Sequence, residues 1–204
     1  MAKSEHFERE LSLIKNPVLR DMVREYMDSP FVPAYFWQIG ASSSGKFHPI
    51  FAQGNGGLVR HTKAVVMFAE ELLKMSSYAY MRDDYKDYVI AACIIHDTAK
   101  YGTANEMDKT AYAQHAPNAA NSFNLFCCSV WGHSAPEMLL GAIRSHMGQW
   151  STDKDDRPFT QIDRCVHMAD YMASRSFIDI PNLIQEYEMM EMDLPFVFEE
   201  GEQE

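Results

Sequence analysis

The sequence lacks the patterns that mark a membrane-spanning, secreted or disulfide-stabilised protein. Its longest uninterrupted apolar stretch lies around residues 89–95, which is far shorter than the roughly 20 residues needed to cross a bilayer. The N-terminus shows no apolar segment of the kind found in secretory signal peptides. The four cysteines (Cys93, Cys127, Cys128 and Cys165) form no C-x-x-C pair. These absences predict a cytoplasmic protein with reduced thiols.

The sequence also lacks the basic surface expected of a protein that binds duplex nucleic acid. The formal net charge is −11, from 18 Lys and Arg against 29 Asp and Glu. Eight of the acids follow position 185, where no Lys or Arg occurs, so residues 1–185 carry a net charge of only −3. Because duplexes are held mainly through cationic contacts with phosphate, the composition argues against a duplex partner. The acidic segment 181–204 is expected to be a solvated or partly docked tail.

What the sequence does contain is a succession of helical patterns separated by turn-forming residues. Residues 7–27 indicate one or two amphipathic helices interrupted at Asn16-Pro17, where Asn16 can cap the second. After a loop rich in Pro, Gly and Ser over residues 29–57, helices are expected at about 58–75, 85–98, 115–130, 136–147 and 160–175. No strand pair and no internal repeat is evident. We therefore predict an all-α, compact single-domain fold, with residues 1–57 packing on a core of residues 58–180.

Histidine and aspartate side chains within these segments form a candidate metal site. His96 and Asp97 end the most apolar helix, which places a nitrogen and an oxygen ligand side by side in the helical core. The full set is His61, His96, Asp97, His115, His146 and Asp170. Imidazoles and carboxylates without thiolate suit a catalytic ion better than structural zinc. Because six ligands exceed the need of one ion with open positions, we predict one or two divalent ions (Mn, Fe, Co, Ni, Zn or Mg), with Asp97 bridging a pair.

These motifs resemble the HD-domain superfamily of metal-dependent phosphohydrolases, and within it the HD domain of bacterial 3′→5′ exoribonucleases. The resemblance runs through Gly56-Gly57-Leu58-Val59-Arg60-His61-Thr62, His96-Asp97-Thr98-Ala99-Lys100, Ser145-His146-Met147-Gly148 and Ala169-Asp170. It implies that His61, His96, Asp97 and Asp170 are the defining ligands and that His115 and His146 admit a second ion. It also implies that Lys100 lies near the metals and helps to hold phosphate, a role that its charge suits.

Two departures from those exoribonucleases limit what the resemblance implies. The chain has no room for the OB-fold that grips single strands ahead of their HD domain. In addition, Met147 stands where they carry a second histidine. The first departure weighs against polymeric RNA as a substrate, and the second bears on occupancy by a second ion.

Several polar residues near the ligands are candidates for catalysis or substrate binding. We predict catalytic roles for Asp97 and Lys100. We predict substrate contacts for Lys100, Arg60, Arg144 and His48, with a solvated helix face as the competing interpretation for each arginine. His167, one turn before Asp170, is expected to support the site rather than bind a metal.

The leading hypothesis is a phosphohydrolase that cleaves a phosphoester or phosphoanhydride of a nucleotide or short oligonucleotide, by attack of a metal-activated hydroxide on phosphorus. Three alternatives stay open: a 3′→5′ exoribonuclease-like phosphodiesterase acting on single-stranded RNA, a di-iron oxygenase of the HD type, and a non-catalytic HD-related binding module. The compact, non-basic body favours a small nucleotide over a long polymer. No membrane partner is expected, and the apolar loops and Met-rich segments would permit a homodimer.

Overall fold

The computed structural model describes residues 2–42 and 48–192. Within these ranges every named element is a helix, and no strand is present. α1 (Glu8–Ser12) and α2 (Pro17–Asp28) are separated at Asn16, whose side chain accepts hydrogen bonds from the backbone N–H groups of Val18 and Leu19. This is the N-cap that Asn16-Pro17 predicts. The core helices are α3 (Gly57–Leu72), α4 (Asp83–Ile95), α5 (His115–Phe126), α6 (Glu137–Ser145) and α7 (Gln161–Ala173).

Short helices connect these elements. They are the 3-10 helices η1 (Lys3–Phe7), η2 (Ala34–Trp37), η3 (Ile50–Ala52), η4 (Lys109–Gln114) and η6 (Gly148–Trp150), and the π-helix η5 (Cys127–Trp131) that extends α5. The predicted loop of residues 29–57 therefore holds two short 3-10 helices in its described part. Positions 43–47 of that loop lie outside the described residues.

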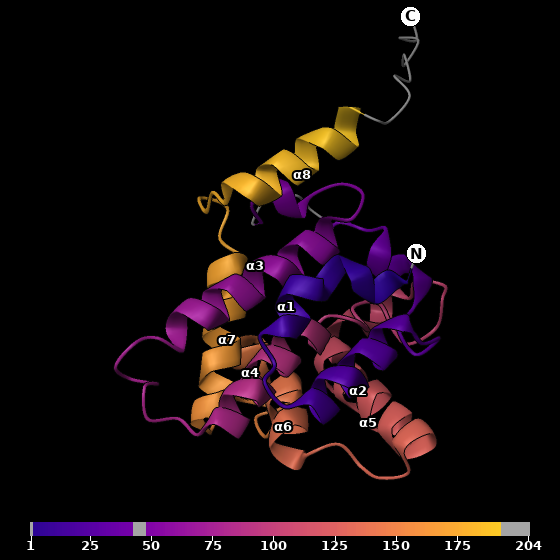
Figure 1. Cartoon of the computed structure of the whole chain (residues 1–204). Coiled ribbons are helices and arrows are strands. Elements are labelled where there is room, and N and C mark those ends of the chain that lie inside the picture. The colour runs from indigo at the N-terminus through magenta and orange to yellow at the C-terminus, as the bar shows by residue number, and fades with distance from the viewer. Residues whose placement is uncertain (1, 43–47, 193–204) are drawn as a thin grey trace, which may run out of the picture.

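Helix α4 is the centre of the molecule. It contacts α3, α5, α6 and α7, and the N-terminal helices α1 and α2 pack on it as well. Figure 1 shows α4 enclosed among these helices. Every residue from Val89 to Ile95 is buried, which explains why this stretch is apolar on all sides rather than on one face. The carboxyl end of α4, where His96 and Asp97 follow, is thereby fixed inside the protein.

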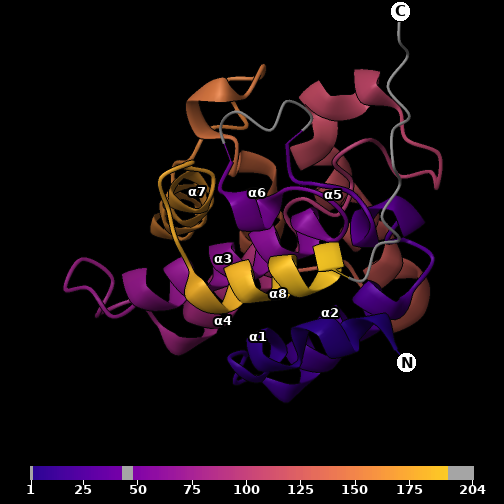
Figure 2. The same cartoon turned by 90° about the horizontal axis from the view of Figure 1, so that it is seen from above.

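The last described helix, α8 (Pro181–Met192), lies along the outside of α3, as Figures 1 and 2 show. Leu183 of this helix is buried, and Glu186 pairs with Lys63 of α3 at 3.0 Å. The first half of the acidic C-terminal segment is thus a docked helix. Residues 193–204, the rest of the predicted tail, lie outside the described residues.

Buried apolar side chains contributed by the helices and the loops between them form one continuous core. The four cysteines form no disulfide, and three of them are buried while Cys128 is exposed. Among the helices described, none combines the length and the apolar character needed to cross a membrane.

Candidate metal centre

The structure brings all six predicted ligands together, although they come from five separate parts of the fold. His61 lies on α3, His96 and Asp97 follow α4, His115 begins α5, His146 follows α6, and Asp170 lies on α7. Their nitrogen and oxygen atoms form three overlapping groups, and the atoms of each group lie within 4.8 Å of one another. The groups are His61–His96–Asp97, His96–His146–Asp170 and Asp97–His115–His146.

The turn after α4 determines the direction in which the side chains of His96 and Asp97 point. The backbone N–H of His96 still donates to Ala92 of the helix, while that of Thr98 donates to the carbonyl of Ile95 and so tightens the chain into a turn. The hydroxyl of Thr98 also lies 3.0 Å from that of Tyr26 in α2. The end of the central helix is therefore held from both sides, and Asp97 is directed into the space between α3, α5, α6 and α7.

The two carboxylate oxygens of Asp97 face two different sets of histidines. Oδ2 lies 3.6 Å from Nε2 of His96 and 3.9 Å from Nε2 of His61. Oδ1 lies 3.2 Å from Nε2 of His115 and 3.8 Å from Nε2 of His146. Asp170 completes the first set, because its Oδ1 lies 3.0 Å from Nε2 of His61 and 3.7 Å from Nε2 of His96. The centre therefore has two halves joined by one carboxylate.

Backbone hydrogen bonds fix the tautomers of three of these histidines. Nδ1 of His96, His115 and His146 lies 2.6–2.8 Å from a backbone carbonyl oxygen three residues earlier in the chain. A carbonyl can only accept, so each Nδ1 must carry the proton and donate it. The opposite nitrogen, Nε2, then turns an unprotonated lone pair toward the centre, which is the arrangement of metal-binding histidines supported by a carbonyl acceptor.

This arrangement leaves lone pairs inside the protein that need a cation. Nε2 of His115 and Nε2 of His146 lie 2.9 Å apart, so two lone pairs face each other. Nε2 of His96 and Oδ1 of Asp97 are buried and have no hydrogen-bond partner. Buried polar atoms of this kind are unfavourable unless something pairs with them. The donor set and its unpaired atoms fit divalent metal ions.

The charges in the centre reinforce this fit. Burial, and secondarily the neighbouring His96 and His115, lower the pKa of His146 to about 3, so this imidazole is neutral at physiological pH. Burial alone would raise the pKa of Asp97, but Lys100, His96 and His115 outweigh it and hold that pKa well below the usual value. Burial also lowers the pKa of His96. Neutral His96 and His146 beside an ionised Asp97 are in the protonation states that metal binding requires.

Lys100 lies in the centre, as the sequence predicts. Its Nζ donates to Oδ2 of Asp97 at 2.5 Å, and both side chains are almost completely buried. Burial lowers the pKa of Lys100, but Asp97 more than compensates and raises it above the usual value. Lys100 therefore remains charged, and it brings a fixed positive charge to the metal ligands.

His48 also lies at the centre. Its ring centroid is 5.3 Å from that of His61, and its Nδ1 is buried without a hydrogen-bond partner. Burial lowers the pKa of His48 to about 3. His167 supports the site from α7, since its Nδ1 donates to the backbone carbonyl of His146 at 2.7 Å.

The two predicted arginines are engaged in other contacts. Arg60 donates to the carbonyls of Phe51 (2.5 Å) and Gln53 (2.8 Å), and its guanidinium lies 5.4 Å from the ring centre of Tyr187 in α8. Arg144 pairs with Glu137 at 2.9 Å and lies 3.9 Å from Asp156. Both arginines are therefore engaged by other protein groups, and a substrate contact for either one stays a prediction.

One residue at the centre is not found by the sequence reasoning. Tyr112 of η4 has its ring centre 6.0 Å from Nζ of Lys100 and 5.1 Å from the ring centre of His115. Its carbonyl is also the acceptor for Nδ1 of His115. Its spacing of three residues before a ligand histidine is the only signal in the sequence, and His96 and His146 have their acceptors at the same spacing.

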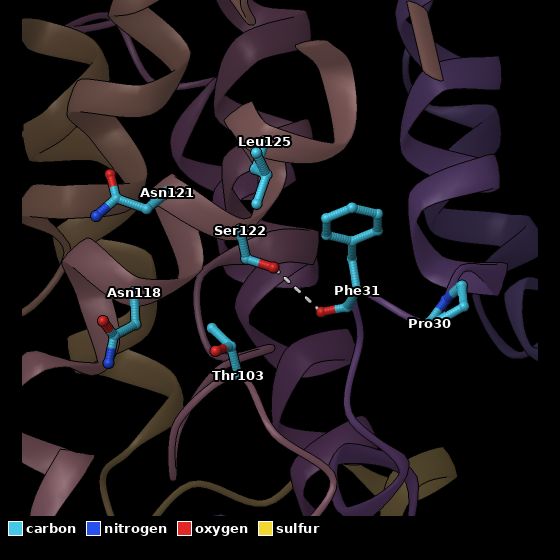
Figure 3. A pocket seen from close by; sticks show the side chains of 7 residues that line it. All are labelled: Pro30, Phe31, Thr103, Asn118, Asn121, Ser122 and Leu125. Atoms are coloured by element: carbon cyan, nitrogen blue, oxygen red, sulfur yellow. Dashed lines mark hydrogen bonds between the residues drawn. The ribbon is translucent and has the colours of Figure 1, made fainter. Parts of the chain in front are cut away.

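A cavity of about 490 Å³ opens beside α5, separate from the metal ligands (Figure 3). It is lined by Pro30, Phe31, Thr103, Asn118, Asn121, Ser122 and Leu125. The hydroxyl of Ser122 donates to the carbonyl of Phe31 at 3.1 Å across its wall, as drawn in Figure 3. Two of the residues that line this cavity lie close in sequence to residues of the metal centre. Thr103 follows Lys100 by three residues, and Asn118 follows His115 by three.

The fold and the site together define an all-helical protein whose core holds a His/Asp centre suited to divalent metals. The family profile of the HD domain matches residues 58–175, more than half of the chain. The chain therefore belongs to the HD domain family, and this membership indicates a metal-dependent phosphohydrolase. No curated protein and no solved structure gives a match to the chain.

Proposed function

We propose that this protein hydrolyses a phosphoester or phosphoanhydride bond of a small nucleotide, using a pair of divalent ions held by the six ligands. The observation that carries the proposal is the division of the centre by Asp97, with His61, His96 and Asp170 on the side of Oδ2 and His115 and His146 on the side of Oδ1. A carboxylate that offers one oxygen to each of two ligand sets is suited to bridge two ions.

The imidazoles and carboxylates of the six ligands can be divided between the two halves. By their distances, His61, His96, Asp97 and Asp170 would supply two nitrogens and two carboxylates to one half, and His115, His146 and Asp97 two nitrogens and one carboxylate to the other. The two halves adjoin, because atoms of His96, His146 and Asp170 also lie within 4.8 Å of one another. With three or four protein ligands in each half, an ion held there would keep positions for water and for a phosphate oxygen. When bound, divalent ions lower the pKa of water and offset negative charge on phosphate oxygens.

The protein's own groups supply orientation and additional charge. The ammonium group of Lys100 has three N–H donors, and one of them donates to Asp97. We assign the remaining donors to a phosphate oxygen of the substrate, where a fixed positive charge stabilises the charge that develops during displacement. His48, neutral and with a buried unpaired Nδ1, is the candidate for a further hydrogen bond to the substrate.

Substrate size follows from how the centre is buried. Five of the six ligand side chains are at most 3% exposed, whereas the side chain of Asp170 is 19% exposed. Asp170 is therefore the ligand over which a phosphate group would approach the centre. Together with the net charge of −3 over residues 1–185, this favours a mononucleotide, or the end of a short single strand, over a duplex.

The test is turnover of the full chain on a panel of nucleotides with Mn²⁺, Co²⁺ or Mg²⁺ added. The panel contains NTPs, dNTPs, monophosphates, cyclic mono- and dinucleotides and short RNA. Asp97→Asn is run beside the wild type, with metal content determined on the same samples. We expect hydrolysis that requires both the metal and Asp97, and the best substrate defines the activity.

Other results would redirect the proposal. Preference for short RNA over every mononucleotide would favour the exoribonuclease-like alternative. Bound iron with oxygen-dependent turnover and no hydrolysis would favour the di-iron oxygenase. A metal-loaded wild type that hydrolyses nothing in the panel would refute the proposal, and a protein that binds no metal would favour a binding module.

A further inference from the structure

Two aromatic rings are stacked on the surface next to the metal ligands. The rings of Trp150 and Tyr171 have centroids 5.7 Å apart and planes only 11° from parallel. Trp150 is 49% exposed and Tyr171 is 36% exposed. The guanidinium of Arg175 lies 4.3 Å from the centre of the Tyr171 ring. Single exposed aromatic residues are ordinary, but a parallel pair with a cation beside it forms a flat, electron-rich surface.

The position of Trp150 is fixed through the metal ligand His146. The chain turns sharply after His146, where Gly148 has a φ of +59° and begins the 3-10 helix η6. His167 presses against this turn and donates to the carbonyl of His146. The ring of Trp150 lies against both His167 (centroids 6.1 Å apart) and Tyr171. The stacked pair is therefore held in a defined place relative to the centre.

The stacked pair comes from the segments that follow two of the metal ligands, His146 and Asp170. Gln114 and Thr152 are joined by a hydrogen bond of 3.4 Å, so the segment before His115 meets the segment after His146. Asp170, the most exposed ligand, immediately precedes Tyr171 on α7. Trp150 follows His146 by four residues, a separation of less than about 14 Å even for extended chain. A nucleotide whose phosphate lies at the metal ligands can place its base at this distance.

We propose that Trp150, supported by Tyr171, is the stacking surface for the base of the nucleotide substrate. This inference rests on the proposed function and adds a binding site for the base. The surface suits any base, because every base has a π-face, and it would contribute to affinity more than to discrimination between bases. Arg175 adds a cation against the Tyr171 ring that supports Trp150.

The test is calorimetric binding of two probes to the full chain in the presence of Mn²⁺. AMP carries a base, while ribose 5-phosphate carries the same phosphate and sugar without one. Trp150→Ala should weaken the binding of AMP by about 5- to 150-fold, the range that removal of one base-stacking side chain produces. It should leave ribose 5-phosphate binding within about twofold, since the phosphate site is intact.

Two further variants separate stacking from other effects. Trp150→Phe keeps an aromatic face and should retain most of the affinity for AMP. Phe177→Ala removes another highly exposed aromatic ring and should change neither affinity. Circular dichroism and metal content of each variant show whether the fold and the metal ligands are intact.

Several results would overturn the inference. One is that the wild type shows no binding of AMP at millimolar concentration. Another is that Trp150→Ala binds AMP with unchanged affinity. A third is that Trp150→Ala loses the same affinity for AMP and for ribose 5-phosphate. Selective loss of AMP binding in Asn121→Ala rather than Trp150→Ala would place the base in the cavity of Figure 3 instead. A dimer in sedimentation that Trp150→Ala dissociates would assign the surface to a second copy.

The inference and the proposed function fail separately. If no nucleotide in the panel is hydrolysed but Trp150→Ala selectively weakens AMP binding, the binding surface stands and the hydrolase proposal falls. If hydrolysis occurs and Trp150→Ala leaves KM and kcat unchanged, the proposed function stands and the base lies elsewhere.

Discussion

Replacement of Gly148 by alanine tests whether the turn after His146 is as tightly built as the structure shows. A Cβ at this position would lie 2.1 Å from Cε1 of His167 and 2.5 Å from both ring nitrogens. The ring cannot move freely, because its Nδ1 donates to the carbonyl of His146 and its other contacts include Trp150. The substitution therefore forces either the ring or the turn to shift, and both are connected to a metal ligand.

The expected loss of stability has four contributions. The positive φ costs about 1–2 kcal/mol for a residue with a side chain, and crowding against the imidazole costs about 1–3 kcal/mol. Loss of the hydrogen bond from His167 to His146 adds about 0.5–1.5 kcal/mol. The reduced freedom of the unfolded chain returns about 0.4–1 kcal/mol. Gly148→Ala should thus lower the free energy of unfolding by about 2–6 kcal/mol.

Gly132 provides a matched control within the same chain. It also has a positive φ, of +76°, but a Cβ there would meet nothing within 4 Å. Gly132→Ala should therefore lose only about 0–1.5 kcal/mol, the conformational cost less the gain from the unfolded chain. Urea denaturation of the metal-free proteins measures both. In a His167→Ala background, the cost of Gly148→Ala should fall to that of Gly132→Ala. Equal losses for the two glycine variants in the wild-type background would refute the reasoning.

Two other predictions concern the metals and pH. Mn²⁺ at about 100 times its Kd should raise the free energy of unfolding by about 2.7 kcal/mol, or the Tm by about 5–11 °C. Asp97→Asn should abolish this rise in stability, and an undiminished rise in that variant would contradict the assigned centre. His115→Ala should reduce the rise and should remove one bound ion, as measured by elemental analysis. As pH falls below about 6.5, the metal-free protein should lose stability, because the folded pKa of His48 is about 3 and the unfolded chain takes up that proton first. His48→Gln should lose less between about pH 6.5 and 4.5 in urea titrations, and an unchanged slope would show that His48 is not buried as described.

The arrangement of helices and the convergence of the six ligands were predictable from the sequence for a physical reason. Apolar periodicity reports which face of a segment is buried, and the all-round apolar stretch before His96 indicates a central helix. Polar residues that interrupt a buried stretch must find partners. His61 in α3 and the pair His96-Asp97 directly after α4 are such residues, and the structure places them together.

The protein contacts of Arg60 and Arg144 could not be obtained in this way, because neighbours in sequence do not face the same direction on a helix. Consecutive residues are about 100° apart around the helix axis. Arg60, immediately before His61, accordingly points to the loop carbonyls of Phe51 and Gln53. Arg144, two residues before His146, points to Glu137 and Asp156. Lys100 differs because it lies in the turn after α4, where its side chain folds back onto Asp97.

Contacts between distant segments were also beyond the sequence. The stacking of Trp150 on Tyr171 joins residues separated by a loop and by most of α7. The acidic composition of the C-terminal segment left open whether it is solvated or partly docked, and it gave no contacts for α8. The helix docks because Leu183 is buried and because Lys63 and Arg60 of α3 offer cations to Glu186 and to the ring of Tyr187.

The same geometry links metal binding to the stability of the whole protein. The ligands come from α3, α5, α7 and the turns after α4 and α6, so no short segment of the unfolded chain can reproduce the site. Ions that bind only the folded state stabilise it by mass action, and here they would also separate the facing lone pairs of His115 and His146. An HD domain that served only as a scaffold would not need these lone pairs, and apolar residues at the two positions would pack at lower cost. Metal-dependent stability is therefore the property that separates the proposed hydrolase from a binding module, even before a substrate is known.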